Sequence, residues 1–123
     1  MDIIINRRSS MRGDKVDDKY KEYAQVFKAL SDPNRLMVVD MLSCGELCAC
    51  VILKKFQITQ PTLSHHMKTL CDCKLVNWRK EGKWTYYSLN DETVQSFRSF
   101  LEAVTSAKDD CACHEINCEV DCI

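Results

Sequence analysis

The fold is decided by residues 59–68, which read Thr59-Gln60-Pro61-Thr62-Leu63-Ser64-His65-His66-Met67-Lys68. Thr59 can cap a helix, and Pro61 in the first turn lacks an N–H that the helix would leave unbonded anyway. The apolar face of this predicted helix consists of Leu63, Met67 and Leu70. The polar side chains off that face are Thr62, Ser64, His65 and Lys68. The pattern predicts an amphipathic helix with a polar, cationic outer face.

A second, short helix is predicted directly before this stretch, at about 46–55, from the apolar residues Leu47, Val51 and Ile52. The connection between the two, residues 56–58, is only a few residues long. Two short helices joined by a tight turn are typical of a helix-turn-helix.

A β-hairpin is predicted after the helix-turn-helix. Residues 76–79 and 84–87 are rich in aromatic and β-prone side chains, and they flank a turn that contains Gly82. The tip of the hairpin is basic, with Arg79, Lys80 and Lys83. A basic hairpin in this position indicates the wing of a winged helix.

Three further helices complete the predicted domain. The first spans about 19–30, and Asp32-Pro33 starts the second. The stripe predicted to be buried in the second helix consists of Leu36, Val39 and Leu42. A last long helix begins at Asn90 or Asp91. Its apolar residues form a narrow stripe, which fits either a helix–helix dimer seam or packing on its own domain: Val94, Phe97, Leu101 and Val104.

The predicted fold is therefore mainly α with a small β-hairpin, a winged helix-turn-helix. If the narrow stripe of the last helix is a dimer seam, the chain forms a homodimer through its first and last helices. Residues 1–18 form an arm, 19–107 the DNA-binding and dimerisation domain, and 108–123 a Cys-rich acidic tail. The 123 residues are 46% hydrophobic and 28% charged, which fits one globular domain. The sequence contains neither an apolar run of membrane-spanning length nor an export signal, so we expect a cytoplasmic protein without a membrane partner.

Charge is distributed unevenly although the formal net charge is only −1. Residues 54–83 carry seven cations against two carboxylates, a net of +5, whereas residues 108–123 carry one cation against five carboxylates, a net of −4. A basic middle segment indicates a surface that binds a polyanion.

Cysteine is unusually frequent, with nine residues, an odd number, and three Cys-x-Cys pairs. In a reducing cytosol, clustered thiols are more often metal ligands or redox sensors than disulfides.

Three segments resemble the ArsR/SmtB family of metalloregulatory repressors. Residues 46–50, Glu-Leu-Cys-Ala-Cys, look like the family's metal-binding box, often written ELCVC. Residues 60–67 are similar to its recognition helix, Q-x-x-[VIL]-S-x-H-[LM], and residues 80–89 to its wing. The resemblance runs from about residue 20 to residue 104. It implies a winged-helix homodimer that binds operator double-stranded DNA without metal and leaves it when metal binds.

Helix-turn-helix geometry places the N-terminal half of the second helix in the major groove. The candidate base-reading residues are Gln60, Thr62, Ser64 and His65. The candidate phosphate contacts are Lys68, Lys80 and Lys83. An ordinary solvated helix face is the alternative for single residues of this set. His66 can instead make a hydrogen bond at the domain surface.

Cys48 and Cys50 are the predicted metal ligands. Soft thiolates select soft ions, so arsenite or antimonite is the expected inducer, with cadmium and lead as alternatives. On an ideal helix, side chains at i and i+2 point ~200° apart. We therefore expect ion binding to unwind the start of the helix at 46–55 and to misplace the DNA-binding helix.

The third ligand is left open by the sequence. In arsenic-sensing relatives it lies three residues beyond the second box cysteine, where this chain has Leu53, so Cys44 is the first candidate. A related subgroup uses a cysteine at the position of Cys73, which with Cys71 is also suited to plain packing. The zinc-site pattern of other relatives matches only at Asp91.

The tail offers four further thiols: Cys111, Cys113, Cys118 and Cys122. They can form a second thiolate site, a metal trap or a source of the third ligand, or have no role. A thiol redox-sensing repressor is a second functional hypothesis. A metal-storage protein or thiol enzyme is a third, but the sequence has no cysteine–base arrangement to support an enzyme.

Overall fold

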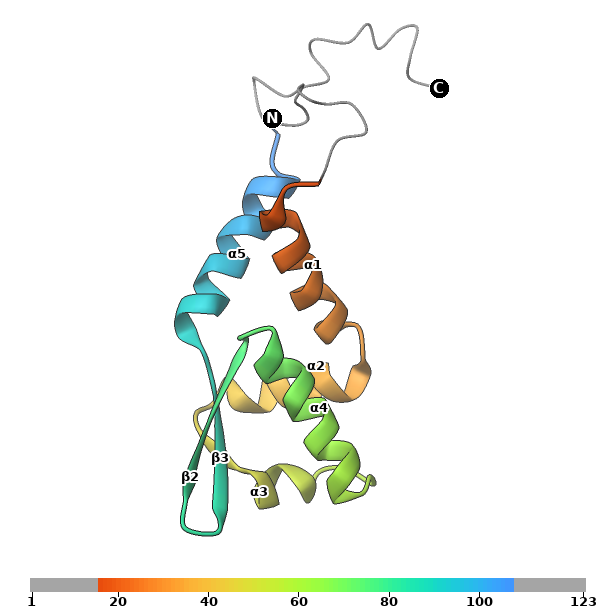
Figure 1. Cartoon of the computed structure of the whole chain (residues 1–123), viewed down its shortest axis with the longest axis vertical. Coiled ribbons are helices and arrows are strands. Elements are labelled where there is room, and N and C mark those ends of the chain that lie inside the picture. Colours follow the sequence, from red (N-terminus) through yellow and green to blue (C-terminus); the bar gives the residue numbers. More distant parts are fainter. Residues whose placement is uncertain (1–15, 108–123) are drawn as a thin grey trace, which may run out of the picture.

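The computed structural model describes residues 16–107, drawn as a coloured ribbon in Figure 1. Within them lie five α-helices and one antiparallel sheet of three strands in the order β1-β3-β2. The elements are α1 Asp18–Leu30, α2 Pro33–Leu42, β1 Leu47–Cys48, α3 Ala49–Leu53, α4 Gln60–Asp72, β2 Val76–Glu81, β3 Trp84–Leu89 and α5 Asp91–Thr105. The tail at 108–123 and nearly all of the predicted arm at 1–18 lie outside the described residues.

Helices α2, α4 and α5 begin at the caps predicted from the sequence. Oδ1 of Asp32 accepts from the backbone N–H of Asn34 at 2.7 Å, with Pro33 in the first turn of α2. Oγ1 of Thr59 accepts from the backbone N–H of Thr62 at 3.3 Å at the start of α4. Asn90 caps α5 in the same way. These bonds satisfy N–H groups that a helix leaves without internal partners.

The core lies between α2, α3, α4 and the sheet. The fully buried side chains of greatest volume are Ile52, Met67, Leu70, Leu75 and Val38. The predicted buried face of α4 is confirmed, since Leu63, Met67 and Leu70 are all at most 3% exposed.

The buried stripe predicted for α2 is partly wrong. Leu36 is 52% exposed, whereas Val38 is fully buried and Leu42 is 2% exposed. Residues 36–39 are all apolar, so helical periodicity alone could not choose between two faces. Packing against α4 selects the face that carries Val38.

The first and last helices pack on each other and rise side by side away from the rest of the domain (Figure 1). The ring of Tyr23 stacks on Phe100 with centroids 4.0 Å apart, and Phe27 meets Phe97 edge-on at 5.0 Å. Val94 and Phe97 of the predicted seam also pack against the core. The other two seam residues, Leu101 and Val104, are 40% and 49% exposed.

The helix predicted at 46–55 starts later than expected. Leu47 and Cys48 form strand β1, and α3 begins at Ala49. Cys48 has φ −73° and ψ 144°, which is extended backbone. Strand β1 pairs with β3 of the hairpin, with Leu47 opposite Tyr87 and Cys48 opposite Tyr86. Backbone pairing with the wing therefore replaces the first helical turn that local sequence favoured.

The predicted hairpin is confirmed. Strands β2 and β3 pair from Val76 opposite Leu89 to Glu81 opposite Trp84, and Gly82 turns the chain with φ +63°. No helix within residues 16–107 has the length and apolar character needed to cross a bilayer.

Candidate DNA-binding face and thiol site

The polar face of α4 is exposed as predicted. Its buried side anchors the helix on the core, and the side chains left on the outer side are Gln60, Thr62, Ser64, His65 and Lys68. Hydroxyl, amide and imidazole groups can all hydrogen-bond to base edges in a major groove. The face can therefore present the predicted base-reading residues together.

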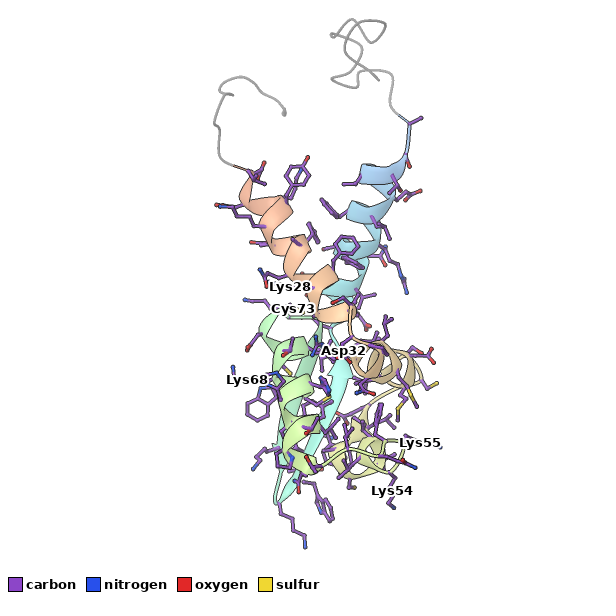
Figure 2. The ribbon with its side chains drawn as sticks, turned by 90° about the vertical axis from the view of Figure 1, so that its right-hand side faces the viewer. Lys28, Asp32, Lys54, Lys55, Lys68 and Cys73 are labelled. Carbon is purple, nitrogen blue, oxygen red and sulfur yellow. The ribbon has the colours of Figure 1, made fainter. Side chains whose placement is uncertain are left out.

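Lys68 lies on the outer side of α4, on the opposite side of the molecule from Lys54 and Lys55 in Figure 2. Its Nζ contacts Oδ2 of Asp72 at 3.0 Å, and the two side chains are 73% and 66% exposed. Exposed ion pairs of this kind contribute little to stability. Exchange of Asp72 for a DNA phosphate as the partner of the Lys68 ammonium therefore costs little free energy.

The wing tip carries the other two predicted phosphate contacts. Lys80 on β2 and Lys83 in the turn are both exposed. Nζ of Lys83 lies 5.2 Å from the centroid of the Trp84 ring, a cation–π contact that leaves the ammonium accessible.

His66 turns inward, away from the polar face, and is 7% exposed. Its Nδ1 lies 3.0 Å from Nη1 of Arg35 on α2. This contact confirms that His66 makes a hydrogen bond, but the side chain is buried and does not lie at the domain surface as expected.

The two box cysteines lie against each other. Sγ of Cys48 is 2.9 Å from Sγ of Cys50. The expectation that these side chains diverge by ~200° assumed that both lie on one helix, and it is wrong because Cys48 belongs to β1. Two soft donors already face the same point, so the pair fits a thiophilic ion without unwinding of α3.

The thiols of the pair differ in acidity. The hydrogen bond from the Cys50 side chain and the backbone N–H groups of Cys50 and Val51 lower the pKa of Cys48. The same contact with Cys48, together with desolvation, raises the pKa of Cys50. The Cys48 sulfur is therefore the one that ionises first, and the thiolate is the form that binds soft ions.

A cavity of about 240 Å³ opens beside the pair. Its walls come from three segments of the chain: Cys48, Ala49, Cys50 and Leu53 of β1 and α3; Gln60, Leu63, Ser64 and Met67 of α4; and Lys83, Trp84, Thr85 and Tyr87 of the wing. Both Gln60 and Ser64 are predicted base-reading residues. The thiol pair therefore borders the predicted DNA-binding helix and the wing directly.

The remaining described cysteines do not join the pair. Cys44, the predicted third ligand, is exposed, and Cys71 and Cys73 are half-buried. Burial raises the pKa of both Cys71 and Cys73. Within residues 16–107, no three Cys, His, Asp or Glu side chains converge on one point. Cys111, Cys113, Cys118 and Cys122 lie outside the described residues.

One part of the site was missed by sequence reasoning. Both oxygens of the Glu46 carboxylate accept from the Arg79 guanidinium, at 2.8 Å each. The side-chain hydrogen bonds from Arg79 lower the pKa of Glu46, and those to Glu46 raise the pKa of Arg79. The only signal in the sequence was the alternation of side chains along β2, which places Arg79 and Trp78 on opposite faces of the sheet.

The short helix α3, the tight connection, the exposed helix α4 and the basic hairpin define a winged helix-turn-helix DNA-binding protein. The model of the bacterial regulatory proteins of the arsR family matches residues 32–77. The chain is 50% identical over 94 residues to the arsenical resistance operon repressor of Staphylococcus xylosus, covering 76% of this chain and 90% of that one. The chain thus belongs to the ArsR family of transcriptional regulators.

Other relatives agree with this assignment. A cadmium resistance transcriptional regulatory protein CadC homolog of Staphylococcus aureus is 44% identical over 83 residues, covering 65% of this chain and 69% of that one. Among solved structures, an ArsR-like transcriptional regulator from Rhodococcus sp. RHA1 superposes with a TM-score of 0.64 at 25% identity, covering 72% of this chain and 83% of that one. These relatives are transcription regulators and not enzymes.

Proposed function

We propose that the protein is a homodimeric repressor that leaves its operator when a thiophilic metalloid, arsenite or antimonite, binds Cys48 and Cys50. The observation that carries the proposal is the position of the two sulfurs, 2.9 Å apart and at the wall of the cavity shared with α4 and the wing. The named arsenical resistance repressors among the relatives support the same inducer class.

Release follows from the shape of the shared cavity. An ion held by Cys48 and Cys50 takes up room beside Gln60 and Ser64 on one side and Lys83 on the other. It thereby alters the spacing between the recognition helix and the wing, which both contact DNA in this class of protein. By linkage, the ion weakens DNA binding by the same factor by which DNA weakens ion binding.

Three sources are proposed for the third ligand of the ion. The first is Cys44, which is exposed and lies four residues before Cys48 in the sequence. Cys73 with Cys71 and the four tail cysteines are the other two sources. Cadmium and lead, which take three or four thiolates, are the alternative inducers, and the cadmium resistance regulatory protein among the relatives supports cadmium.

Dimerisation is proposed through α1 and α5. Both helices leave large apolar side chains exposed after packing on each other: Tyr20, Phe27, Leu101 and Val104. Several large apolar side chains left exposed on two helices that pack on each other favour a protein interface there. A two-fold dimer would place its two recognition helices in successive major grooves of the operator DNA, and we propose that it does so in the cytoplasm.

Operator binding titrated with ions tests the proposal. The duplex is the promoter fragment upstream of the gene, and the ions are arsenite, antimonite, cadmium, lead and zinc. We expect arsenite or antimonite to release the wild type, and Cys48→Ser and Cys50→Ser to remain bound. Thr69→Ser is the control, because it keeps a hydroxyl on α4 and Thr69 does not line the cavity beside the pair. Release of both pair variants by the ion would contradict the assignment of the site.

A thiol redox switch is the second candidate function, and the 2.9 Å contact of the two sulfurs favours it. Oxidation would join or modify the same pair and disturb the same cavity. Release by peroxide that a thiol reductant reverses, with no release by metal ions, would support this candidate over metalloid sensing.

A further inference from the structure

A side-chain bridge crosses the sheet beside the thiol pair. We define the Arg79 clamp as Glu46, Arg79 and Tyr86. Nε and Nη2 of Arg79 each donate to one oxygen of Glu46 at 2.8 Å, a two-pronged ion pair. The guanidinium also lies over the Tyr86 ring, with Cζ 4.6 Å from the ring centroid. The planar guanidinium of Arg can form two parallel hydrogen bonds and stack on an aromatic ring at the same time, whereas the ammonium of Lys cannot.

The clamp joins strands that are not neighbours. In the order β1-β3-β2, β1 and β2 are separated by β3. Tyr86 of β3 lies opposite Cys48 of β1 on one side and opposite Arg79 of β2 on the other. Glu46 directly precedes β1, so its bond to Arg79 passes across Tyr86. The ligand Cys48 is thus held to the wing both by backbone pairing and by this bridge.

Backbone pairing alone is a weak connection at this place. Strand β1 has two residues and pairs with β3 at only two positions. Short edge strands fray because few hydrogen bonds and little burial hold them. Arg79 and Glu46 are 49% and 37% exposed, so the pair adds little to overall stability. Its consequence is geometric, since it fixes β1 to the hairpin that carries the cationic tip.

We propose that Glu46, Arg79 and Tyr86 are positioning residues that transmit ion capture at Cys48 to the wing. This inference rests on the proposed function and names the structural element that carries its regulation. When the clamp is intact, a displacement of Cys48 moves the β2–β3 hairpin and hence Lys80 and Lys83. When it is broken, β1 can detach from the hairpin, and ion binding at Cys48 then moves the wing less.

The principal test is Glu46→Gln in the full-length protein. Glutamine keeps the size and polarity of Glu46 but loses the charge that holds Arg79. Glu46 is itself negative, so its change does not remove a phosphate contact. Arg79→Lys is the second variant, because it keeps the positive charge but loses the fork and the planar stacking. Glu81→Gln is the matched control, since Glu81 lies 3.5 Å from Arg79 but on the same strand.

Three quantities are measured for each variant: arsenite affinity, affinity for the promoter duplex without arsenite, and duplex affinity at saturating arsenite. The ratio of the two duplex affinities is the coupling factor, about 5- to 150-fold in typical allosteric proteins. We expect Glu46→Gln and Arg79→Lys to bind arsenite like the wild type while the coupling factor falls at least fivefold. Glu81→Gln should keep the wild-type factor.

Two results would overturn the inference while leaving the proposed function intact. One is an unchanged coupling factor in Glu46→Gln. The other is a parallel loss of arsenite affinity, which would mean that the clamp shapes the thiol site and does not transmit from it. Failure of the wild type itself to leave DNA with any of arsenite, antimonite, cadmium and lead would instead contradict the proposed function, and the inference with it.

Discussion

Arg35 and the buried His66 form a part-buried link between helices: Nη1 of Arg35 lies 3.0 Å from Nδ1 of His66. Nε of the same Arg35 donates to the carbonyl oxygen of Ala29 at 2.7 Å. Because a guanidinium can only donate, Nδ1 accepts, and the proton of the neutral imidazole lies on Nε2. One side chain of α2 thus ties the end of α1 to the recognition helix α4.

Replacement of His66 by leucine should destabilise the protein. The substitution keeps a bulky side chain but removes the acceptor for Arg35, and loss of one partner of a buried hydrogen bond costs about 1–3 kcal/mol. His65→Leu is the matched control, since His65 is exposed on the adjacent position and should change stability by less than about 0.5 kcal/mol. Urea unfolding at equal protein concentration measures both. Equal midpoints for the two variants would contradict the structural role of His66.

Ile52→Ala should destabilise the protein strongly. Ile52 is fully buried and is the one side chain of the short helix α3 that is completely inside the core. Truncation of a buried Ile to Ala leaves a cavity and costs about 2–5 kcal/mol. The neighbouring Val51 is 41% exposed, so Val51→Ala should lose less than about 1 kcal/mol. A thermal or urea unfolding comparison decides between them, and similar losses would mean that α3 packs differently.

Helices α4 and α3 also show which features of the fold could be predicted from the sequence. The caps and apolar spacing of α4 are local signals, and they gave its start at Thr59 and its buried face correctly. In α3, the adjacent residues Val51 and Ile52 are both apolar, so their spacing could not show which of them is buried. Only packing against the core decides that Ile52 is inside and Val51 outside.

The thiol site was predictable in its residues but not in its geometry. The pattern Cys-x-Cys identified the pair, and helix propensity then predicted diverging side chains. Cys48 is extended because Tyr86, far along the chain, supplies its backbone partner. A strand of two residues leaves no readable period, so neither this pairing nor the bridge from Glu46 to Arg79 could be seen locally.

Stability should fall in acid as Asp32 is protonated. Desolvation raises the pKa of Asp32, but backbone hydrogen bonds from Asn34 and Arg35 outweigh it, so the pKa is lowered in the folded protein. A lowered folded pKa means that the stabilisation is present above the ordinary value of about 3.9 and is lost as pH falls through the folded value.

Asp32→Asn isolates this contribution, because its amide oxygen still caps α2 but does not titrate. We expect the difference in urea midpoint between the wild type and Asp32→Asn to narrow below about pH 4. The midpoints are measured from neutral pH downward at constant ionic strength. A difference that stays constant throughout that range would show that the Asp32 charge does not stabilise the folded state.

Removal of the wing-tip charge should lower the salt dependence of DNA binding. Lys83→Gln removes one predicted phosphate contact, so the slope of log affinity against log salt should become shallower by about 0.9 for each copy bound. Lys28→Gln is the control. Lys28 lies on α1 near Cys73, at the C-terminal end of α4 (Figure 2), whereas Lys83 lies near the N-terminal half of α4. Slopes from the promoter duplex at several salt concentrations test both, and an unchanged slope for Lys83→Gln would remove it from the interface.

Trp84 should report ion binding at the thiol pair by fluorescence. Its ring lines the same cavity as Cys48 and Cys50, whereas Trp78, the other tryptophan, does not line it and is 60% exposed. In Trp78→Phe, where only Trp84 emits, arsenite should change the emission in a saturable way, because the ion alters the surroundings of the indole. In Trp84→Phe, where only Trp78 emits, the same titration should leave the emission nearly constant. The change should also vanish when Cys48→Ser is added to Trp78→Phe. A saturable signal that persists in that double variant would place the ion elsewhere, and a signal confined to Trp78 would show that the ion does not enter the cavity.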